Sequence, residues 1–436
     1  MQRRLISLAL AASAATALLH AQIYFPQNRD EKLALMIPRL FGPDGLTLPN
    51  DFHHAHFESD FIQQSFTSVN TAIGTQMATL PFASPGAGFV YNFNSSAGVF
   101  QRSTDSFGAI LTESAETIGR HKLYLGFSYQ HFHFDKIDGI SLSAFPGVLR
   151  HEQQTGAAYE KDAVITQASI DLSMNQFTAV ATYGLTSRID VSAAIPFVNA
   201  HFGLASLLTI DRVAPPSPKF GQAHYFDPSN PDGSTQAVYA MTNTASGIGD
   251  VTLRLKWTAF QGERASIALL GDVRLPTGDA LNLLGSGAPG VHPFVAISYP
   301  LRRFATRVNL GYQWNGRSIL AGDPNVNRKG DLPDAVTYDG GVDFAATRHL
   351  TFAGDFLGQH LIGATRVVPV TYTDALGRTF PETRLEKSSL ELVSGAIGAK
   401  LNITHTLLLT ANAIFPLNNA GLRARVVPLI GVSWTF

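Results

Sequence analysis

Residues 423–436, RARVVPLIGVSWTF, decide the fold class of this chain. Apolar side chains recur at every second position, and the positions between them are mostly polar or small. The even-numbered positions include the apolar residues Val426, Ile430, Val432, Trp434 and Phe436. The odd-numbered positions include Arg425, Gly431, Ser433 and Thr435. Successive side chains of a β-strand point to opposite faces, so this pattern predicts a strand with one apolar face and one polar face.

The first residues have the composition of a secretory signal. Two arginines precede an apolar run at residues 5–19, and Ala21 then supplies the small residue that a signal peptidase accepts. We therefore expect residues 1–21 to be removed and the mature chain to begin at Gln22. An exported chain that ends in an alternating strand predicts a β-barrel in a Gram-negative type of outer membrane.

Composition narrows the alternatives. Charged residues make up 15% of the 436 residues, compared with about 25% in typical soluble proteins. The net charge is −1, which gives no reason to expect a nucleic-acid partner. The chain has no cysteine, so disulfides and thiolate chemistry are excluded. After the signal there is no run of about 18 apolar residues, so a membrane crossing must come from strands.

Twelve segments have strand character. They are residues 119–135, 164–183, 189–202, 247–260, 265–275, 291–301, 305–315, 335–346, 350–360, 389–402, 407–417 and 423–436. Their connections alternate between short turns and longer loops, as in bacterial barrels with short periplasmic turns and long external loops. The sequence therefore predicts an all-β, antiparallel transmembrane barrel of twelve strands over residues 119–436.

Alternation alone fits a soluble sandwich as well as a membrane barrel. In a sandwich the apolar face would pack in the core and the polar face would meet solvent, whereas in a barrel the apolar face meets lipid and the polar face meets the lumen. The signal and the strand lengths, near the ~9–11 residues that cross a membrane at a tilt, favour the barrel. Residues 164–183 change phase halfway, since the apolar parity up to Met174 differs from that after Phe177. A β-bulge near residues 175–176 would keep both halves facing lipid, and we predict one there.

Charged residues on the polar parity are expected to face the lumen. The candidates are Asp250, Arg254, Lys256, Asp272, Arg274, Arg307, Asp339 and Asp343, together with Asp171, Asp190, Asp355, Lys400 and Arg425. Their mixed signs do not form the ring of one charge that a selective ion pore uses. Two interpretations remain open: a lattice of ion pairs that holds the wall and an internal plug, or a polar track for a ligand.

Residues 22–118 differ from the rest, with many Pro, Gly, Ser and Thr residues and weak periodicity. We expect an N-terminal periplasmic or plug-like segment inside the lumen. Residues 88–103 have the pattern of a short hairpin. The alternative adds this hairpin to the wall and gives fourteen strands.

The loop after residue 275 is the candidate constriction. Pro276, Thr277, Gly278 and Asp279 form a tight turn at the external end of a strand, and the loop could fold inward. The simpler interpretation is that Pro and Gly only set the turn geometry. The glycines of residues 285–290 spell G-x-G-x-x-G, but a strand follows where a nucleotide-binding fold needs a helix, so no nucleotide site is predicted.

Two stretches of the predicted barrel resemble a known family. Residues 246–257 (SGIGDVTLRLKW) and 271–287 (GDVRLPTGDALNLLGSG) are similar to outer-membrane transporters named for the meta-pathway of phenol degradation. Residues 106–130 resemble the segment that leads into the first barrel strand of such proteins. The similarity is best from about residue 106 to residue 315. The resemblance implies a barrel of the fatty-acid and aromatic-hydrocarbon channel type that passes small apolar molecules.

The predicted function is passive uptake of small, hydrophobic or aromatic molecules. Alternatives are a structural or general-diffusion porin and, less favoured, an outer-membrane lipid hydrolase, for which Asn315 near Ser318 is the only suggestion. No catalytic residues, metal site or cofactor are predicted. The expected partners are outer-membrane lipid, an apolar solute and the barrel-assembly machinery, which we expect to recognise the terminal Phe436.

Overall fold

A computed structural model describes most of the chain. The described residues are 21–24, 31–41, 45–49, 56–57, 59–78, 91–94, 99–102, 106–151, 157–218, 221–262, 264–404 and 406–436. The predicted signal falls almost entirely outside them, and so do the side chains of the predicted hairpin at residues 88–103. Within these residues no helix is both long enough and apolar enough to span a membrane.

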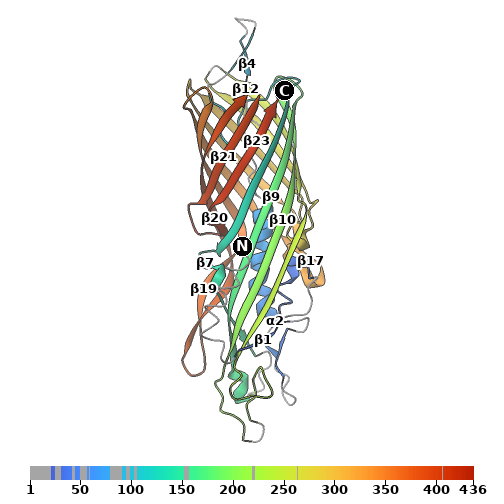
Figure 1. Cartoon of the computed structure of the whole chain (residues 1–436), viewed down its shortest axis with the longest axis vertical. Coiled ribbons are helices and arrows are strands. Elements are labelled where there is room, and N and C mark those ends of the chain that lie inside the picture. Colours follow the sequence, from blue (N-terminus) through green and yellow to red (C-terminus); the bar gives the residue numbers. More distant parts are fainter. Residues whose placement is uncertain are drawn as a thin grey trace.

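The fold is a closed antiparallel barrel (Figure 1). Its strands are β6 (Leu123–Ile137), β9 (Ala163–Gly184), β10 (Ile189–Asp211), β11 (Gln236–Ile248), β12 (Val251–Gln261), β13 (Ser266–Leu275), β14 (Gly290–Pro300), β15 (Phe304–Asn315), β18 (Asp334–Ala345), β19 (Leu350–Thr373), β20 (Thr379–Thr404), β21 (Leu407–Pro416), β22 (Leu422–Ala424) and β23 (Val427–Thr435). β6 pairs with β9 on one side and with β22 and β23 on the other, which closes the ring.

The predicted number of twelve strands is confirmed. β11 and β12 pair in succession with the same long strand, β10, and together occupy one place in the wall. β22 and β23 do the same beside β6. The first break falls at residues 249–250, opposite Pro196, whose carbonyl accepts the N–H of Gly249 at 2.8 Å. Proline has no N–H for the ladder, so a break in the neighbouring strand is easiest there.

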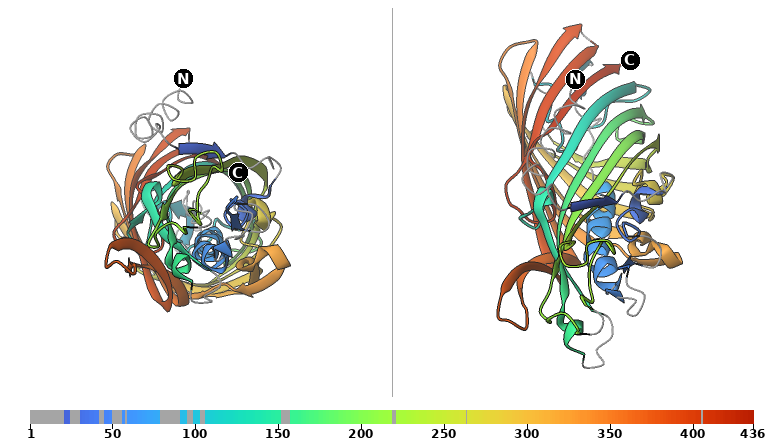
Figure 2. Two further views of the ribbon diagram at one scale, coloured as in Figure 1. Left: turned by 90° about the horizontal axis from the view of Figure 1, so that it is seen from below. Right: turned by 60° about the horizontal axis from the view of Figure 1, so that its bottom comes forward.

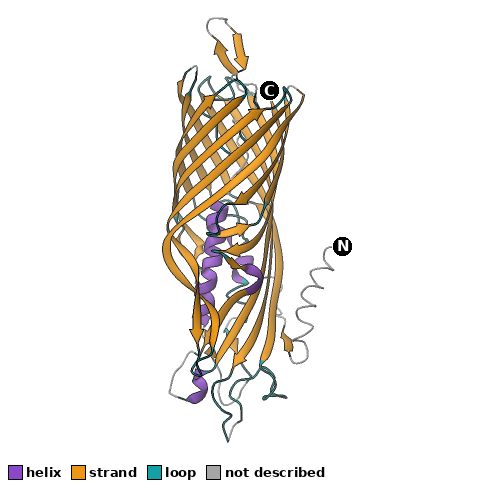
Figure 3. Cartoon of the chain, turned by 90° about the vertical axis from the view of Figure 1, so that its left-hand side faces the viewer, coloured by secondary structure: helices purple, strands orange, loops and turns teal. Residues whose placement is uncertain are grey.

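The remaining described elements are not among the strands that make up the closed ring. They are β1 (Ala21–Tyr24), η1 (Leu33–Leu35), β2 (Leu46–Thr47), β3 (His56–Phe57), α2 (Ser59–Ala78), β4 (Tyr91–Asn94), β5 (Val99–Arg102), β7 (Ile140–Ser141), η2 (Leu142–Ala144), β8 (Phe145–Arg150), η3 (Ala158–Lys161), η4 (Ala280–Asn282), β16 (Arg317–Asp323), η5 (Pro324–Val326) and β17 (Arg328–Asp331). β4 and β5 pair only with each other, so the fourteen-strand alternative is wrong. Their hairpin extends beyond the rim of the barrel in Figure 3 rather than into the wall.

The two ends of the barrel differ. The C-terminus and the short turns, such as the one between β9 and β10, lie at one rim, which is the periplasmic rim in bacterial barrels (Figure 1). β9, β10, β19 and β20 are 22 to 26 residues long, and a membrane crossing needs only ~9–11. These four strands therefore extend past the membrane at the other end of the barrel. Helix α2 lies inside the ring of strands in this external half (Figure 2).

The outer face carries a continuous apolar band, as expected for a wall in contact with lipid. Large side chains point outward from every part of the ring, and Phe127 (52% exposed), Leu255 (54%) and Trp314 (47%) are examples. At the external edge of the band, Asn175 and Asn199 bond to each other at 3.3 Å across neighbouring strands, which marks the change to a polar surface. This band and the closed wall make the chain a membrane-spanning barrel.

The bulge predicted in residues 164–183 is wrong. β9 keeps one register with both β6 and β10 over its whole length. Its even-numbered residues point inward throughout, so Leu172 and Met174 are buried inside the barrel while Phe177 faces lipid. The hydrophobic parity changes because the environment changes: the external half of β9 has protein inside and water outside, and Asp171 accordingly lies on the outer surface.

Candidate functional site

Residues 106–118, here called the inner segment, cross the lumen close to the periplasmic rim. They form no helix or strand, so their backbone groups need partners from the wall. Ala115 N–H donates to Ser298 Oγ at 2.9 Å, and Ile118 N–H donates to Asp190 Oδ2 at 2.9 Å. Asn309 makes two bonds to the backbone of Glu113, at 2.7 and 3.0 Å. The polar wall thus takes the place of water for this segment.

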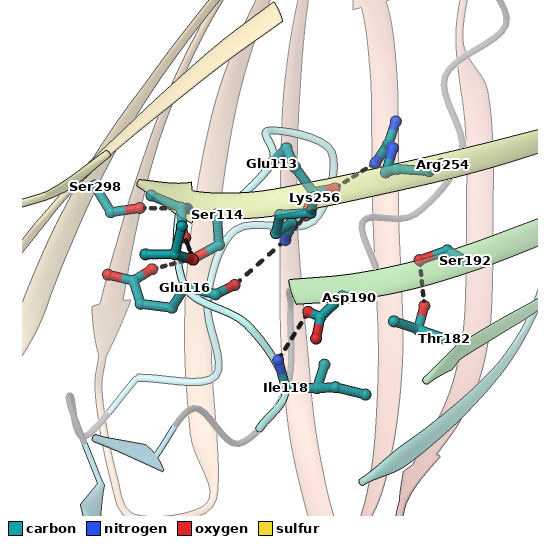
Figure 4. A network of polar contacts seen from close by, with 12 residues as sticks. Glu113, Ser114, Glu116, Ile118, Thr182, Asp190, Ser192, Arg254, Lys256 and Ser298 are labelled. Carbon is teal, nitrogen blue, oxygen red and sulfur yellow. Dashed lines mark hydrogen bonds and ion pairs between the residues drawn. The ribbon is translucent and has the colours of Figure 1, made fainter. Parts of the chain in front are cut away.

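The centre of this contact is Glu113 (Figure 4). Its carboxylate accepts from Lys256 Nζ at 2.5 Å and from Arg254 Nη1 at 2.6 Å. Arg254 also forms a two-bond pair with Asp272, which lies directly opposite it on β13. All four groups are largely buried, and buried charges persist when they are paired and hydrogen-bonded in this way. The predicted cluster of Arg254, Lys256 and Asp272 therefore holds the inner segment.

The start of the inner segment is held by a second group of charges. Ser106 donates to Asp343, which also pairs with Arg307. Asp355 accepts the N–H and the hydroxyl of Thr112, at 3.1 and 2.6 Å. Lys400 donates to the carbonyls of residues 107 and 109. Two more residues predicted to face the lumen thus take part in holding the inner segment. Asp343 contacts it directly, and Arg307 acts through its ion pair with Asp343.

Asp250 has a different role from the other predicted lumen carboxylates. It sits at the break between β11 and β12 and accepts hydrogen bonds from the N–H of Gly278 (3.0 Å), the N–H of Ser286 (2.7 Å) and the Ser286 hydroxyl (2.6 Å). One buried carboxylate therefore fixes both ends of the loop that follows β13. Glycine is needed for this approach, because a Cβ on Gly285 would lie 2.3 Å from Asp250 Oδ1.

The predicted constriction residues are located at the base of this loop. Pro276, Thr277 and Asp279 are exposed, and Gly278 is half-buried against Asp250. None of the four lines the internal cavity described below, whereas Leu284 of the same loop does. That these four residues restrict passage stays a prediction, and the geometry shifts attention to Leu284.

An internal cavity of about 250 Å³ lies between the end of α2 and the inner segment. Its lining has two kinds of wall. The polar part includes Asp250, Arg254, Asp272, Arg274, His292, Asn309, Gln313, Thr337, Asp339 and Gln359, all from β12 to β19 or the break before β12. The apolar part includes Phe132, Phe134, Leu357, Leu392, Ile414 and Val427, mostly from β6 and β20 to β23. The cavity can therefore accommodate a molecule with both an apolar and a polar side.

Arg274 connects the polar wall to α2. Its guanidinium donates to Asn315 Oδ1 at 2.8 Å and to the carbonyl of Ala78, the last residue of the helix, at 2.5 Å. Asp250 Oδ2 lies 3.8 Å from its Nε. A cation at a helix C-terminus is favourable because the last carbonyls have no partner within the helix. Asp339, the remaining predicted lumen residue, lines the cavity.

The external side of the cavity is closed by apolar packing. Residues of η1 and α2, such as Leu33 and Ile73, form one buried cluster with Leu283 and Leu320 of the external loops. At the surface of this cluster, Lys32 pairs with Asp279 at 2.9 Å. Burial alone would raise the pKa of the Asp279 carboxyl, but the hydrogen bond and charge of Lys32 hold that pKa below its usual value.

Glu113 is the functional residue that sequence reasoning missed. It lies in a stretch without periodicity, and only residues on predicted strands were considered as lumen candidates. One feature of the sequence indicates it. Glu113 and Glu116 are the only charged residues among residues 106–119, and the predicted lumen carries cations, such as Arg254 and Lys256, that could pair with them. Arg425, in contrast, was expected to face the lumen but is exposed, because the strand breaks between β22 and β23.

The residues considered for a metal site or a hydrolase site have other contacts where the structure describes them. No group of three potential ligands among the described residues could hold a metal ion. The Ser318 hydroxyl is buried and donates to the carbonyl of Ser286 at 2.6 Å. His360 pairs with Glu391 on the outer surface instead.

Comparisons with known proteins support the resemblance found in the sequence. Residues 166–367 match the family described as "Putative MetA-pathway of phenol degradation". Residues 246–257 and 271–287 lie inside this match, and the third resembling stretch, residues 106–130, lies before it. The predicted resemblance is thus confirmed. A comparison with curated proteins finds no match.

Solved structures with a similar barrel come from several bacteria. An outer-membrane channel of the COG4313 group from Pseudomonas putida F1 has a TM-score of 0.43 and 14% identity, covering 74% of this chain and 98% of that one. A Pseudomonas aeruginosa FadL homologue has a TM-score of 0.32 and 10% identity, covering 73% and 90%. The P. putida toluene transporter TodX has a TM-score of 0.32 and 9% identity, covering 72% and 89%.

Proposed function

We propose that this chain is an outer-membrane channel for passive uptake of small, hydrophobic or aromatic molecules. The observation that carries the proposal is the cavity of about 250 Å³ inside a lipid-facing barrel, with one apolar wall and one polar wall. A volume of this order suits a molecule the size of one aromatic ring with its substituents. No energy-coupling motif is needed, because diffusion down a gradient suffices.

The inner segment is, in this proposal, a plug that must shift for a solute to reach the periplasm. Polar and ionic bonds hold it to the wall near the periplasmic rim, and Ile110 and Leu111 join it to the same apolar cluster that holds η1 and α2. Polar groups that separate can bond to water instead, whereas separated apolar surfaces lose stabilisation in proportion to their area. The contacts that separate in this proposal are therefore the polar ones near the periplasmic rim.

Phe436 supports a second part of the proposal. Its side chain is 59% exposed and lies at the end of the wall. We propose that the barrel-assembly machinery recognises this terminal aromatic during insertion. Replacing Phe436 with Ser should then slow the assembly of the barrel in cells without changing the stability of the refolded protein.

Uptake of toluene into vesicles that contain the purified protein tests the function. We expect toluene to enter faster than into protein-free vesicles, with small and intermittent ionic conductance in planar bilayers. Large, steady and weakly selective conductance would make the chain a general-diffusion porin instead. Toluene entry at the protein-free rate would contradict the proposal.

A further inference from the structure

One buried cation in the cavity wall has no carboxylate beside it. Arg423, on β22, is 8% exposed and lines the cavity. Its Nη2 donates to Asn418 Oδ1 at 2.6 Å and its Nη1 donates to Ser394 Oγ at 3.3 Å. Its Nε–H has no hydrogen-bond partner. The guanidinium is thus held in place by neutral groups and keeps an unused donor.

The other buried arginines of the lumen differ in this respect. Arg254 and Arg307 each have a carboxylate within hydrogen-bond distance, and Arg274 has Asp250 at 3.8 Å. The carboxylate whose charge acts on Arg423 is Asp138, but the ion pair that Asp138 forms is with Arg366, at 3.9 Å. Both oxygens of Asp138 also accept backbone N–H groups, those of Val367 and Gly421, at 2.8 Å.

A buried charge that no opposite charge neutralises is costly, so an arginine of this kind in a cavity wall is a candidate for binding an anion. The surroundings of Arg423 indicate what kind of ligand. Phe132 and Phe134, on the neighbouring strand β6, line the same cavity, and their rings are nearly parallel with centroids 6.0 Å apart. Ile414 and Leu392 add aliphatic surface to the same wall. A cation next to an aromatic wall fits an anion that carries an apolar body.

Negative charge elsewhere in the cavity does not conflict with this fit. Asp250 and Asp272 are engaged by the loop and by Arg254. Asp339 lies on β18, and β19, β20 and β21 separate that strand from β22 in the sheet order. An anion bound at Arg423 would therefore lie against the apolar part of the cavity lining, whereas these carboxylates belong to the polar part.

We infer that Arg423 binds the carboxylate of a small aromatic or short-chain organic acid whose apolar part packs against Phe132 and Phe134. The planar guanidinium matches a carboxylate better than a lysine ammonium would, because it offers parallel N–H donors. This inference rests on the proposed channel function and adds a substrate class to it: amphipathic monocarboxylates, besides pure hydrocarbons such as toluene.

Binding of benzoate and of benzamide, its neutral counterpart of nearly the same shape, tests the inference on the full-length protein in detergent micelles by calorimetric titration. We expect benzoate to bind at least about tenfold more tightly than benzamide to the unaltered protein, since one charge-assisted pair contributes on the order of a tenfold difference. Equal binding of the two would overturn the inference without any mutation.

Variants at two nearby arginines locate the effect. Arg423→Met should reduce benzoate binding to the level of benzamide, and Arg423→Lys should keep part of the preference because the charge remains. Arg425→Met is the matched control, because Arg425 is exposed two positions away, and it should bind benzoate like the unaltered protein. Unchanged benzoate binding in both Arg423 variants, or an equal loss in Arg425→Met, would overturn the inference.

Failure of this inference and failure of the channel proposal are distinguishable. Binding in micelles requires no passage, whereas toluene entry into vesicles requires no carboxylate. A protein that admits toluene but does not prefer benzoate is a channel without this site. If Arg423→Met does not fold, the comparison of benzoate with benzamide on the unaltered protein and on Arg423→Lys still decides the question.

Discussion

Glu113 and Lys256, 143 positions apart in sequence, form a buried ion pair of 2.5 Å inside the barrel. The first residue belongs to the inner segment and the second to the wall strand β12. Arg254, two positions before Lys256, binds the other oxygen of the same carboxylate. The contact explains why two cations lie on the inner face of one strand: they hold an acidic segment that crosses the lumen.

Replacing Glu113 with Gln should loosen the inner segment. The change leaves Lys256 and Arg254 buried with less negative charge, and breaking a buried ion pair costs about 3–5 kcal/mol. We expect conductance in planar bilayers to become larger and more frequent than in the unaltered protein. Lys122→Gln, at an exposed position near the same rim, should behave like the unaltered protein; if both variants conduct equally, the ion pair does not hold the segment.

Replacing Asp250 with Ala should destabilise the loop after β13. The N–H groups of Gly278 and Ser286 and the Ser286 hydroxyl would lose their acceptor, and each unsatisfied buried group costs about 1–3 kcal/mol. Thermal unfolding in detergent should therefore shift to lower temperature. Asp279→Ala removes an exposed carboxylate from the same loop and should have a small effect. An equal shift in the two variants would show that Asp250 is not the residue that fixes the loop.

Gly285→Ala tests the close approach that the family-like motif requires. The added Cβ would collide with Asp250 Oδ1 and come within 3.0 Å of the Cα of Gly278. Overpacking of this kind costs about 1–3 kcal/mol, and we expect a lower midpoint of urea unfolding. Gly271→Ala is the control, because nothing lies within 4 Å of a Cβ at that position. A harmless Gly285→Ala would mean that the glycine is not needed for the Asp250 contact.

Leu255→Arg tests the lipid-facing side of the wall. Leu255 is 54% exposed within the apolar band, and an arginine near the middle of a bilayer costs a barrel about 2–4 kcal/mol. The free energy of folding into phospholipid vesicles should fall by that amount. Val326→Arg, at a residue of an external loop that is 67% exposed, should leave folding unchanged. Equal effects would place Leu255 outside the membrane.

The wall of the barrel could be predicted from the sequence because its two faces have different environments. Alternation in β12 and β15 identified lipid-facing residues such as Leu255 and Trp314, and the turns separated the strands. The prediction failed where this rule ceases to apply. In β9 the inner side becomes apolar and the outer side polar above the membrane, and Met174 was therefore taken to face lipid although it is buried inside.

The site could be predicted only in part. The wall half of the Glu113 cluster was found, because Arg254, Lys256 and Asp272 lie on a regular strand pair. Glu113 was not found, since a segment without periodicity gives no sign of which way its side chains point. The alternation places Arg423 and Arg425 on the same inner face, but a break between β22 and β23 exposes Arg425 and only Arg423 is buried.

The central claim is that a solute passes only when the inner segment shifts, and a disulfide lock tests it most directly. Ala115 N lies 2.9 Å from Ser298 Oγ, so these two residues are in contact and are the positions at which we would place cysteines for an engineered disulfide. The chain has no other cysteine, and Ala115→Cys alone is the control.

We predict that the oxidised double variant Ala115→Cys/Ser298→Cys admits toluene into vesicles no faster than vesicles without protein, and that a reducing agent restores the rate of the unaltered protein. Equal toluene entry in the oxidised and reduced states would contradict the account, because the solute would then pass without movement of the inner segment.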